Sequence, residues 1–397
     1  MSMRKENKNF QFFVITLITL ASVLGITSVP PAFPSIAEHF NVPIQKIGIL
    51  MGVFTMPGII LTPLFGFLAD KYSRKIILVP ALLLFAIAGY GCSLAESFEV
   101  LVLLRGIEGI GAASLGALNV SLIGDTFNKD KISKFAGYNN VVLSFGTAFF
   151  PLIGGYLTLI SWNTVFYLPL FTILVAILFI VAFKNRNQKS QNVDLKKILH
   201  SFKDPEFRKI SVMNFLGYIL LIGCVFTYIP FHFKYTFGFT SKEIGIYLFV
   251  MSLSAAFSSF FLNRAIDIIT EKGIMLVKFF IFFIVIIAIP FLTPTLIYLA
   301  LSLFGMAFGL GFPGMQYWVL KISDNDNRAS LTSMHRGVSQ LGQSLGPVLF
   351  GFFASVYSAK DSVVEIFYLG AVIALFTLIL TFFILRKDIF RLNKGIL

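Results

Sequence analysis

The sequence predicts an all-α membrane protein of twelve transmembrane helices in two pseudo-symmetric bundles of six. Three observations support this fold class. Of the 397 residues, 57% are hydrophobic and only 13% are charged, a balance that a water-soluble domain does not have. Apolar segments of bilayer length recur along the whole chain. Patterns of glycine, proline and charge in the first half also recur in the second.

The apolar segments fall into two groups of six, separated by a polar stretch. The first follows MSMRKENKNF and is longer than a signal-peptide core, so we expect it to be retained as a helix. We predict an N-terminal bundle over 1–183, a cytoplasmic linker over 184–209 and a C-terminal bundle over 210–397. The predicted spans are 11–31, 46–68, 76–94, 98–123, 136–158, 163–183, 210–231, 243–263, 274–292, 295–319, 330–357 and 363–385.

Basic residues gather on one side of the predicted membrane. The net charge of +13 would suggest nucleic acid for a soluble protein, but here most basic residues, Lys278 among them, are assigned to span ends and loops on the side of the amino terminus. Arg105 and Arg336 fall within spans. The positive-inside rule then places both termini in the cytoplasm, for a multi-pass protein of the inner (cytoplasmic) membrane. The lysines on the other side are Lys46, Lys234, Lys242 and Lys360.

The two cysteines, Cys92 and Cys224, lie inside apolar stretches with no spacing typical of a zinc site or a disulfide framework. We interpret both as packing residues. No metal site and no cofactor are expected.

Three short patterns recur at a nearly constant offset and join equivalent spans of the two halves. Such parallel repeats rock about a site at their interface, which predicts transport of a small molecule by alternating access. A shift of 196 residues carries Gly146, Pro151 and Gly155 onto Gly342, Pro347 and Gly351; shifts of 197 and 200 carry Asp70 and Lys75 onto Asp267 and Lys272, and Gly109 and Gly111 onto Gly309 and Gly311.

The loop after the second span reads GFLADKYSRK. It resembles the loop signature of the major facilitator superfamily, in which it implies a latch at the cytoplasmic face. Ser73 stands where the family has a second glycine, so we expect a looser turn. Asp125, at the inner end of helix 4, is a candidate partner of Arg74. The signature residues here are Gly66, Asp70, Lys71, Arg74 and Lys75.

Two further segments carry the resemblance. RGIEGIGAA in helix 4 places Arg105, Glu108, Gly109 and Gly111 at the positions of a second family signature. Helix 5 is similar to the signature of drug and proton antiporters, although Phe150 replaces a usual glycine and weakens that assignment. The SWNTVF segment after it also resembles bacterial efflux members. The matching helix 5 residues are Gly146, Pro151, Gly154 and Gly155.

Glu108 is predicted to be the one acidic residue deep in a hydrophobic run, and Arg105 lies one turn away. An ionisable group there costs roughly 2.5 to 3.5 kcal/mol on insertion scales, so it usually has a function. We expect this pair either to couple transport to protons or to be purely structural.

The resemblance implies that helices 1, 4, 7 and 10 line a central cavity. Helix 1 has no carboxylate in its apolar run, so neutral, zwitterionic or anionic substrates fit at least as well as cationic ones. His335 and Arg336 lie near the inner end of helix 11, where they reach either a cavity or lipid headgroups. The candidate cavity residues are Asn119, Phe226, Tyr228, Gln316, Tyr317 and Trp318.

The leading hypothesis is a proton-coupled exporter of a small amphipathic drug or metabolite; the alternative is an importer or facilitator of a small metabolite. Expected partners are the solute, protons and the lipid bilayer, without nucleic acid, and the chain is expected to be a monomer. A membrane enzyme would need a nucleophile, a metal cluster or paired acids, and an ATP-driven pump a Walker sequence. A sensor usually has an appended signalling domain. None of these features is found.

Overall fold

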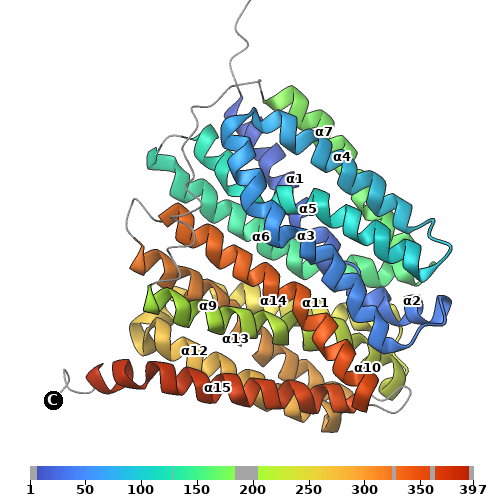
Figure 1. Ribbon diagram of the computed structural model, residues 1–397, viewed down its shortest axis with the longest axis vertical. Helices are drawn as coiled ribbons and strands as arrows, with labels where there is room; N and C mark the ends of the chain where they lie inside the picture. Colours follow the sequence, from blue (N-terminus) through green and yellow to red (C-terminus); the bar gives the residue numbers. More distant parts are fainter. Residues whose placement is uncertain (1–6, 128, 184–203, 324–327, 358–362, 393–397) are drawn as a thin grey trace, which may run out of the picture.

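The computed structural model describes residues 7–127, 129–183, 204–323, 328–357 and 363–392, and within these ranges it contains helices and no strands. Ten helical segments of this part are long and apolar enough to cross a membrane. With α11 and α14, which are also long helices, the described ranges hold twelve such segments; Figure 1 shows how they are arranged. The predicted fold class is confirmed.

The N-terminal half, blue to green in Figure 1, starts with a helix longer than predicted. Its first helix α1 (Lys8–Thr27) continues through η1 (Pro30–Ala32) into α2 (Phe33–His39). The remaining elements run alternately up and down: α3 (Ile44–Lys71), α4 (Arg74–Cys92), α5 (Phe98–Thr126), α6 (Lys129–Thr158), η2 (Thr164–Leu170) and α7 (Phe171–Ala182).

The C-terminal half repeats this order. Its first span is interrupted by the buried π-helical segment η4 (Ile219–Phe226), which joins α9 (Pro205–Tyr218) to α10 (Thr227–Phe237). The others are α11 (Ser241–Ser259), α12 (Leu262–Ala288), η5 (Ile289–Phe291), α13 (Pro294–Ile322), α14 (Arg328–Tyr357) and α15 (Val364–Leu392).

The alternation gives the molecule two ends. We call the end where α1 begins and α15 stops the terminal end, at the left of Figure 1, and the end of α2 and α10 the distal end. The last residues of the predicted linker, 184–209, already belong to α9, which begins at Pro205 with Asp204 as its N-cap. Residues 184–203 lie outside the described ranges.

The ninth span starts earlier than predicted. α12 begins at Leu262 and contains Thr270, whose φ of 63° is left-handed. The Thr270 hydroxyl accepts a hydrogen bond from the Gly273 amide at 3.3 Å and caps the second part of the helix. Lys278, assigned from the sequence to an inner loop, therefore lies in this helix about two turns beyond Thr270 and is 1% exposed. That assignment was wrong, because an apolar run surrounds this lysine on both sides.

The halves meet at the distal end along a seam of glycines. A Cβ on Gly48 would collide with the Pro347 carbonyl, and one on Gly245 would collide with the Pro151 carbonyl. Glycines let membrane helices approach closely, and here each contact has a counterpart in the other half. The second matched pair is Gly155 against the Ser241 carbonyl and Gly351 against the Gln45 carbonyl.

The same interface is open towards the terminal end. A Cβ on Gly116 of α5, or on Gly337 of α14, would meet no atom within 4 Å. Farther along α14, the Ser344 hydroxyl donates to the Gly52 carbonyl of α3 at 3.0 Å. The halves thus pack closely at the distal end and leave open space at Gly116 and Gly337.

Candidate functional site

The buried pair predicted in helix 4 is formed. Arg105 Nη1 donates to Glu108 Oε2 at 2.8 Å, one turn along α5, and Arg105 Nη2 donates to the Gly25 carbonyl of α1 at 2.9 Å. Both side chains are 0% exposed. The pair therefore holds α5 to α1 as well as neutralising its own charges.

The surroundings of this pair are closed. The Arg105 guanidinium lies 4.0 Å from the ring centroid of Phe54, and the Cys92 thiol lies 3.9 Å from Glu108 Oε2. Glu108 Oε1 and Arg105 Nε have no hydrogen-bond partner. The pair is thus enclosed by α1, α3 and α4.

Asn119, predicted to line the cavity, belongs to a second buried polar cluster nearer the terminal end. Its amide donates to the Thr19 hydroxyl at 2.8 Å, and that hydroxyl also bonds Asn139 of α6. The cluster joins α1, α5 and α6. Asn119 is 5% exposed and its Oδ1 has no partner, so it keeps one acceptor unused.

The predicted ion pair at the loop after the second span is formed, whereas its role as a latch stays a prediction. Arg74 Nε donates to Asp125 Oδ2 at 2.9 Å, as predicted, and Lys75 Nζ donates to the Ile180 carbonyl at 2.8 Å. Tyr72 and Ser73 have negative φ angles, and Ser73 caps α4. The turn thus needs no glycine, which explains the departure from the family pattern. Gly66, Asp70 and Lys71 lie in α3, but their side chains lie outside the described ones.

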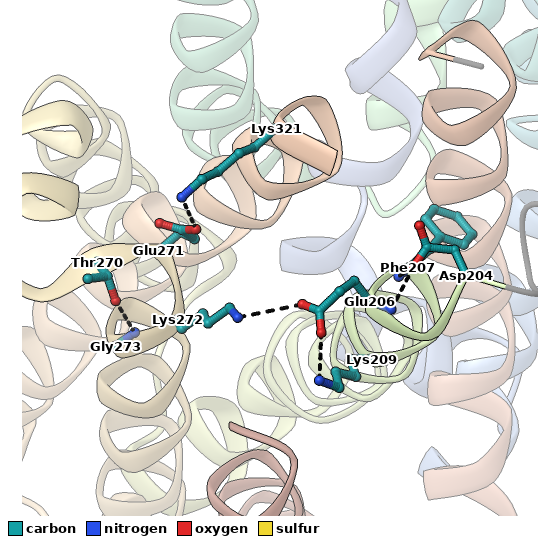
Figure 2. Close-up of polar contacts among 9 residues, drawn as sticks. All are labelled: Asp204, Glu206, Phe207, Lys209, Thr270, Glu271, Lys272, Gly273 and Lys321. Atoms are coloured by element: carbon teal, nitrogen blue, oxygen red, sulfur yellow. Dashed lines mark hydrogen bonds and ion pairs between the residues drawn. The ribbon is translucent and has the colours of Figure 1, made fainter. Parts of the chain in front are cut away.

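The equivalent place in the C-terminal half carries a different set of ion pairs, shown in Figure 2. Lys321 Nζ of α13 bonds Glu271 Oε1 of α12 at 2.5 Å. Glu206 of α9 receives Lys209 at 2.6 Å and Lys272 at 3.6 Å. In the repeat, with its shift of about 197 residues, Glu271 is equivalent to Arg74, and Lys321 lies within one residue of the equivalent of Asp125. The acidic and basic partners of the pair are therefore exchanged between the halves.

The predicted helix 5 residues act in packing. A Cβ on Gly154 would collide with the Ser28 carbonyl, which is the end of α1, and Gly155 belongs to the distal seam. Gly146 faces Leu20 of α1, and Pro151 lies inside α6. These residues set how closely α6 approaches α1 and α11; their part in transport stays a prediction.

The aromatic cavity candidates are dispersed. Tyr228 is 0% exposed, and its hydroxyl donates to the Pro347 carbonyl at 3.3 Å within the distal seam. Phe226 is buried in η4. Trp318 is buried under Lys272, whereas Tyr317 is 38% exposed. Because adjacent helical residues point about 100° apart, Gln316 lies on a different face of α13 from both.

Sequence reasoning missed Lys278. Its Nζ has no hydrogen-bond partner, and its nearest group is the ring of Phe312, 3.6 Å from the centroid. His335 is also buried, at 5% exposed. Arg336 does not extend to lipid headgroups: its Nη1 donates to the Gly116 carbonyl of the other half at 3.2 Å. The location of Lys278 inside the apolar run 274–292 would have revealed it.

Similarity to known proteins agrees with this architecture. Multidrug resistance protein 1 of Bacillus subtilis (strain 168) is 24% identical over 365 residues, covering 88% of this chain and 91% of that protein. Quinolone resistance protein NorA of Staphylococcus aureus (strain MRSA252) is 30% identical over 159 residues, covering 40% and 41%.

Solved structures show the same fold. An inward-facing, unoccupied bacterial homologue of the human lysosomal transporter Spinster matches with a TM-score of 0.81 and 17% identity over 97% of this chain and 98% of that one. The D-xylose-proton symporter matches with a TM-score of 0.75 and 18% identity over 94% and 97%. The family model of the Major Facilitator Superfamily matches residues 15–334 and 232–394. The chain is a membrane transporter that belongs to the major facilitator superfamily.

Proposed function

We propose that the chain exports small amphipathic compounds, drugs or metabolites, in exchange for protons by alternating access. The terminal end faces the cytoplasm. Support for export comes from the relatives named for multidrug and quinolone resistance and from the helix 5 signature. Support for the orientation comes from the basic residues that gather at the terminal end.

The arrangement of the halves supports alternating access. The distal seam closes one face, while the surfaces around Gly116 and Gly337 remain open to the other. Rocking of one bundle against the other would exchange the closed and open ends around a site between them. On this proposal, the state with open space at the terminal end is the one that loads solute from the cytoplasm.

One observation carries the coupling proposal: Glu108 is a completely buried carboxylate within a span, paired with Arg105 and closed off in this state. Protonation would remove the charge that holds Arg105 and loosen the link to α1 at Gly25. Rocking would open the pair to the outside, and return would release the proton inside. The electrical gradient adds about 2.3 kcal/mol per charge for each 100 mV.

The test uses proteoliposomes with norfloxacin as the probe, a quinolone chosen from the name of a relative. The wild type should drive norfloxacin against protons when a pH gradient is imposed. Glu108→Gln should abolish this exchange while norfloxacin counterflow without a gradient persists, which also shows that the variant is folded. Glu271→Gln is the matched control, because that carboxylate is buried at the terminal end and is paired with Lys321.

Driven export that survives in Glu108→Gln would remove Glu108 from coupling. Norfloxacin moving in the same direction as the protons would favour the importer. An absence of any flux would favour a sensor.

A further inference from the structure

Lys278 occupies a position for which the N-terminal half has no charged counterpart. Its side chain runs from α12 towards α9 and α13, where two glycines leave room for it. A Cβ on Gly217 would lie 2.8 Å from Lys278 Nζ, and one on Gly311 would collide with its aliphatic chain. Both neighbouring helices are thus shaped around this lysine.

The ammonium group is held by ring faces alone. Nζ lies 3.6 Å from the centroid of Phe312, 4.7 Å from that of Phe279 and 5.5 Å from that of Phe282. It is 1% exposed and makes no hydrogen bond. An ammonium has three donors, and in a low-dielectric site each unused donor is costly. The Lys278 ammonium therefore lacks the hydrogen-bond acceptors that a buried ammonium needs.

Two residues of α14, His335 and Arg336, lie across the same helix α9. His335 is buried, and its Nδ1 has no hydrogen-bond partner. Asn214 of α9 anchors this turn by donating to the His335 carbonyl at 3.1 Å and the Ser339 hydroxyl at 2.8 Å. Among the residues whose side chains the structure describes, no carboxylate pairs with Lys278, His335 or Arg336.

The group borders the open part of the interface. Arg336 reaches across to the Gly116 carbonyl, and a Cβ added to Gly116 or Gly337 would meet no described atom within 4 Å. The ring of Tyr218 packs on Phe312 at 4.2 Å between centroids, so an aromatic wall adjoins Lys278. A small solute entering between the halves would meet positive charge and aromatic surface together.

We propose that Lys278, His335 and Arg336 bind the carboxylate of the transported compound, with Phe312 and Tyr218 contacting its apolar body. The substrates are then amphipathic organic carboxylates. This inference rests on the proposed export function, because it names the class of compound that is exported. Binding of that compound requires no proton gradient. Charge-assisted hydrogen bonds to a carboxylate would supply the acceptor that the lysine lacks.

The experiment compares three aromatic probes of equal size: 2-naphthoate, neutral 2-naphthamide and cationic 2-naphthylmethylammonium. Equilibrium binding to the purified full chain in phosphatidylcholine nanodiscs is measured without a gradient. We expect 2-naphthoate to bind at least about tenfold more tightly than the other two, as one charge-assisted contact predicts. Lys278→Met should abolish this preference and leave the weak binding of 2-naphthamide unchanged.

Lys242→Met is the matched control, because Lys242 also lies on a ring, 5.1 Å from the centroid of Tyr156, but at the distal end. It should retain the preference for 2-naphthoate. Thermal unfolding of Lys278→Met checks that the fold is intact, and Met matches the length of the lysine chain.

Equal binding of the three probes by the wild type would overturn the proposal, as would an equal loss for all three in Lys278→Met, which indicates a structural role. A preference that disappears when phosphatidylglycerol is added would assign the cluster to a lipid phosphate instead, and would also overturn it. Because no proton gradient is used, failure here is separate from failure of coupling at Glu108.

Discussion

In the N-terminal half the fully buried cation is Arg105, and the carboxylate of Glu108 lies one turn away at 2.8 Å. In the C-terminal half the fully buried cation is Lys278, and the neighbours of its ammonium are phenylalanine rings. Both sites pack against a glycine of the first span of their half, Gly25 of α1 and Gly217 of α9. At the first site the Glu108 carboxylate neutralises Arg105, whereas at the second no described carboxylate neutralises Lys278.

The repeat makes this difference interpretable. Gly109 packs on the Phe54 carbonyl as Gly309 packs on the Ala255 carbonyl, so the scaffold is the same in both halves. At the next matched contact, Gly111 faces Ala81 where Gly311 faces Lys278. At this matched position the N-terminal half has an alanine and the C-terminal half a lysine, so the same helix crossing carries a buried amine only in the C-terminal half. The halves share packing and differ in chemistry.

The largest effect is predicted for a variant that breaks the buried ion pair of Arg105 and Glu108. Glu108→Leu leaves Arg105 charged and unpaired, and this should destabilise the protein by about 3–5 kcal/mol. Equilibrium unfolding in mixed micelles measures the loss. Arg105→Met combined with Glu108→Leu should recover most of it.

Lys278→Met, in contrast, should leave stability unchanged or raise it, because no pair is broken. A large loss for this variant would remove the distinction between the two cations.

A smaller effect tests the shared scaffold. Gly109→Ala and Gly309→Ala each place a methyl group against a backbone carbonyl that cannot move aside, and each should cost about 1–3 kcal/mol. The same unfolding assay applies. Gly337→Ala is the control, since its Cβ would meet nothing within 4 Å. Tolerance of one glycine change and not the other would show that the halves pack differently.

The smallest effect concerns the reversed ion pairs at the terminal end. Exchanging Glu271→Lys together with Lys321→Glu gives this half the polarity of the Arg74 and Asp125 pair. The Lys321 side chain is 54% exposed, so the double change should alter stability by no more than about 1 kcal/mol. Glu271→Lys alone should be worse, because two cations then face each other. A double variant no better than the single one would show that the pair makes no contribution.

Much of the fold could be predicted from the sequence. Span length and the glycine and proline repeat are local patterns, and the seam contacts of Gly155 and Gly351 confirm the offset. The pair of Arg105 with Glu108 followed from the i, i+3 spacing, and that of Arg74 with Asp125 from the place of Asp125 at the inner end of its helix.

The remainder depended on which way side chains point. Arg336 crosses to the other half, and Tyr228 lies in the seam, because helix rotation and the state of the transporter decide both. Lys278 was assigned to an inner loop together with the other basic residues on that side. The kink at Thr270, which the sequence did not reveal, sets where the second part of α12 begins. Spacing alone carries no information on such rotations.

The distal seam determines how the molecule can change state. Its two matched pairs of contacts join glycines to carbonyls, and the ion pair of Lys234 with Glu38, at 3.7 Å, is exposed. Dispersion attraction between such surfaces falls by a quarter to a half over a gap of roughly 0.5–1 Å. A slightly opened seam has therefore already lost much of its attraction, so intermediate positions are sparsely populated. The transporter should pass between its states in a single cooperative event.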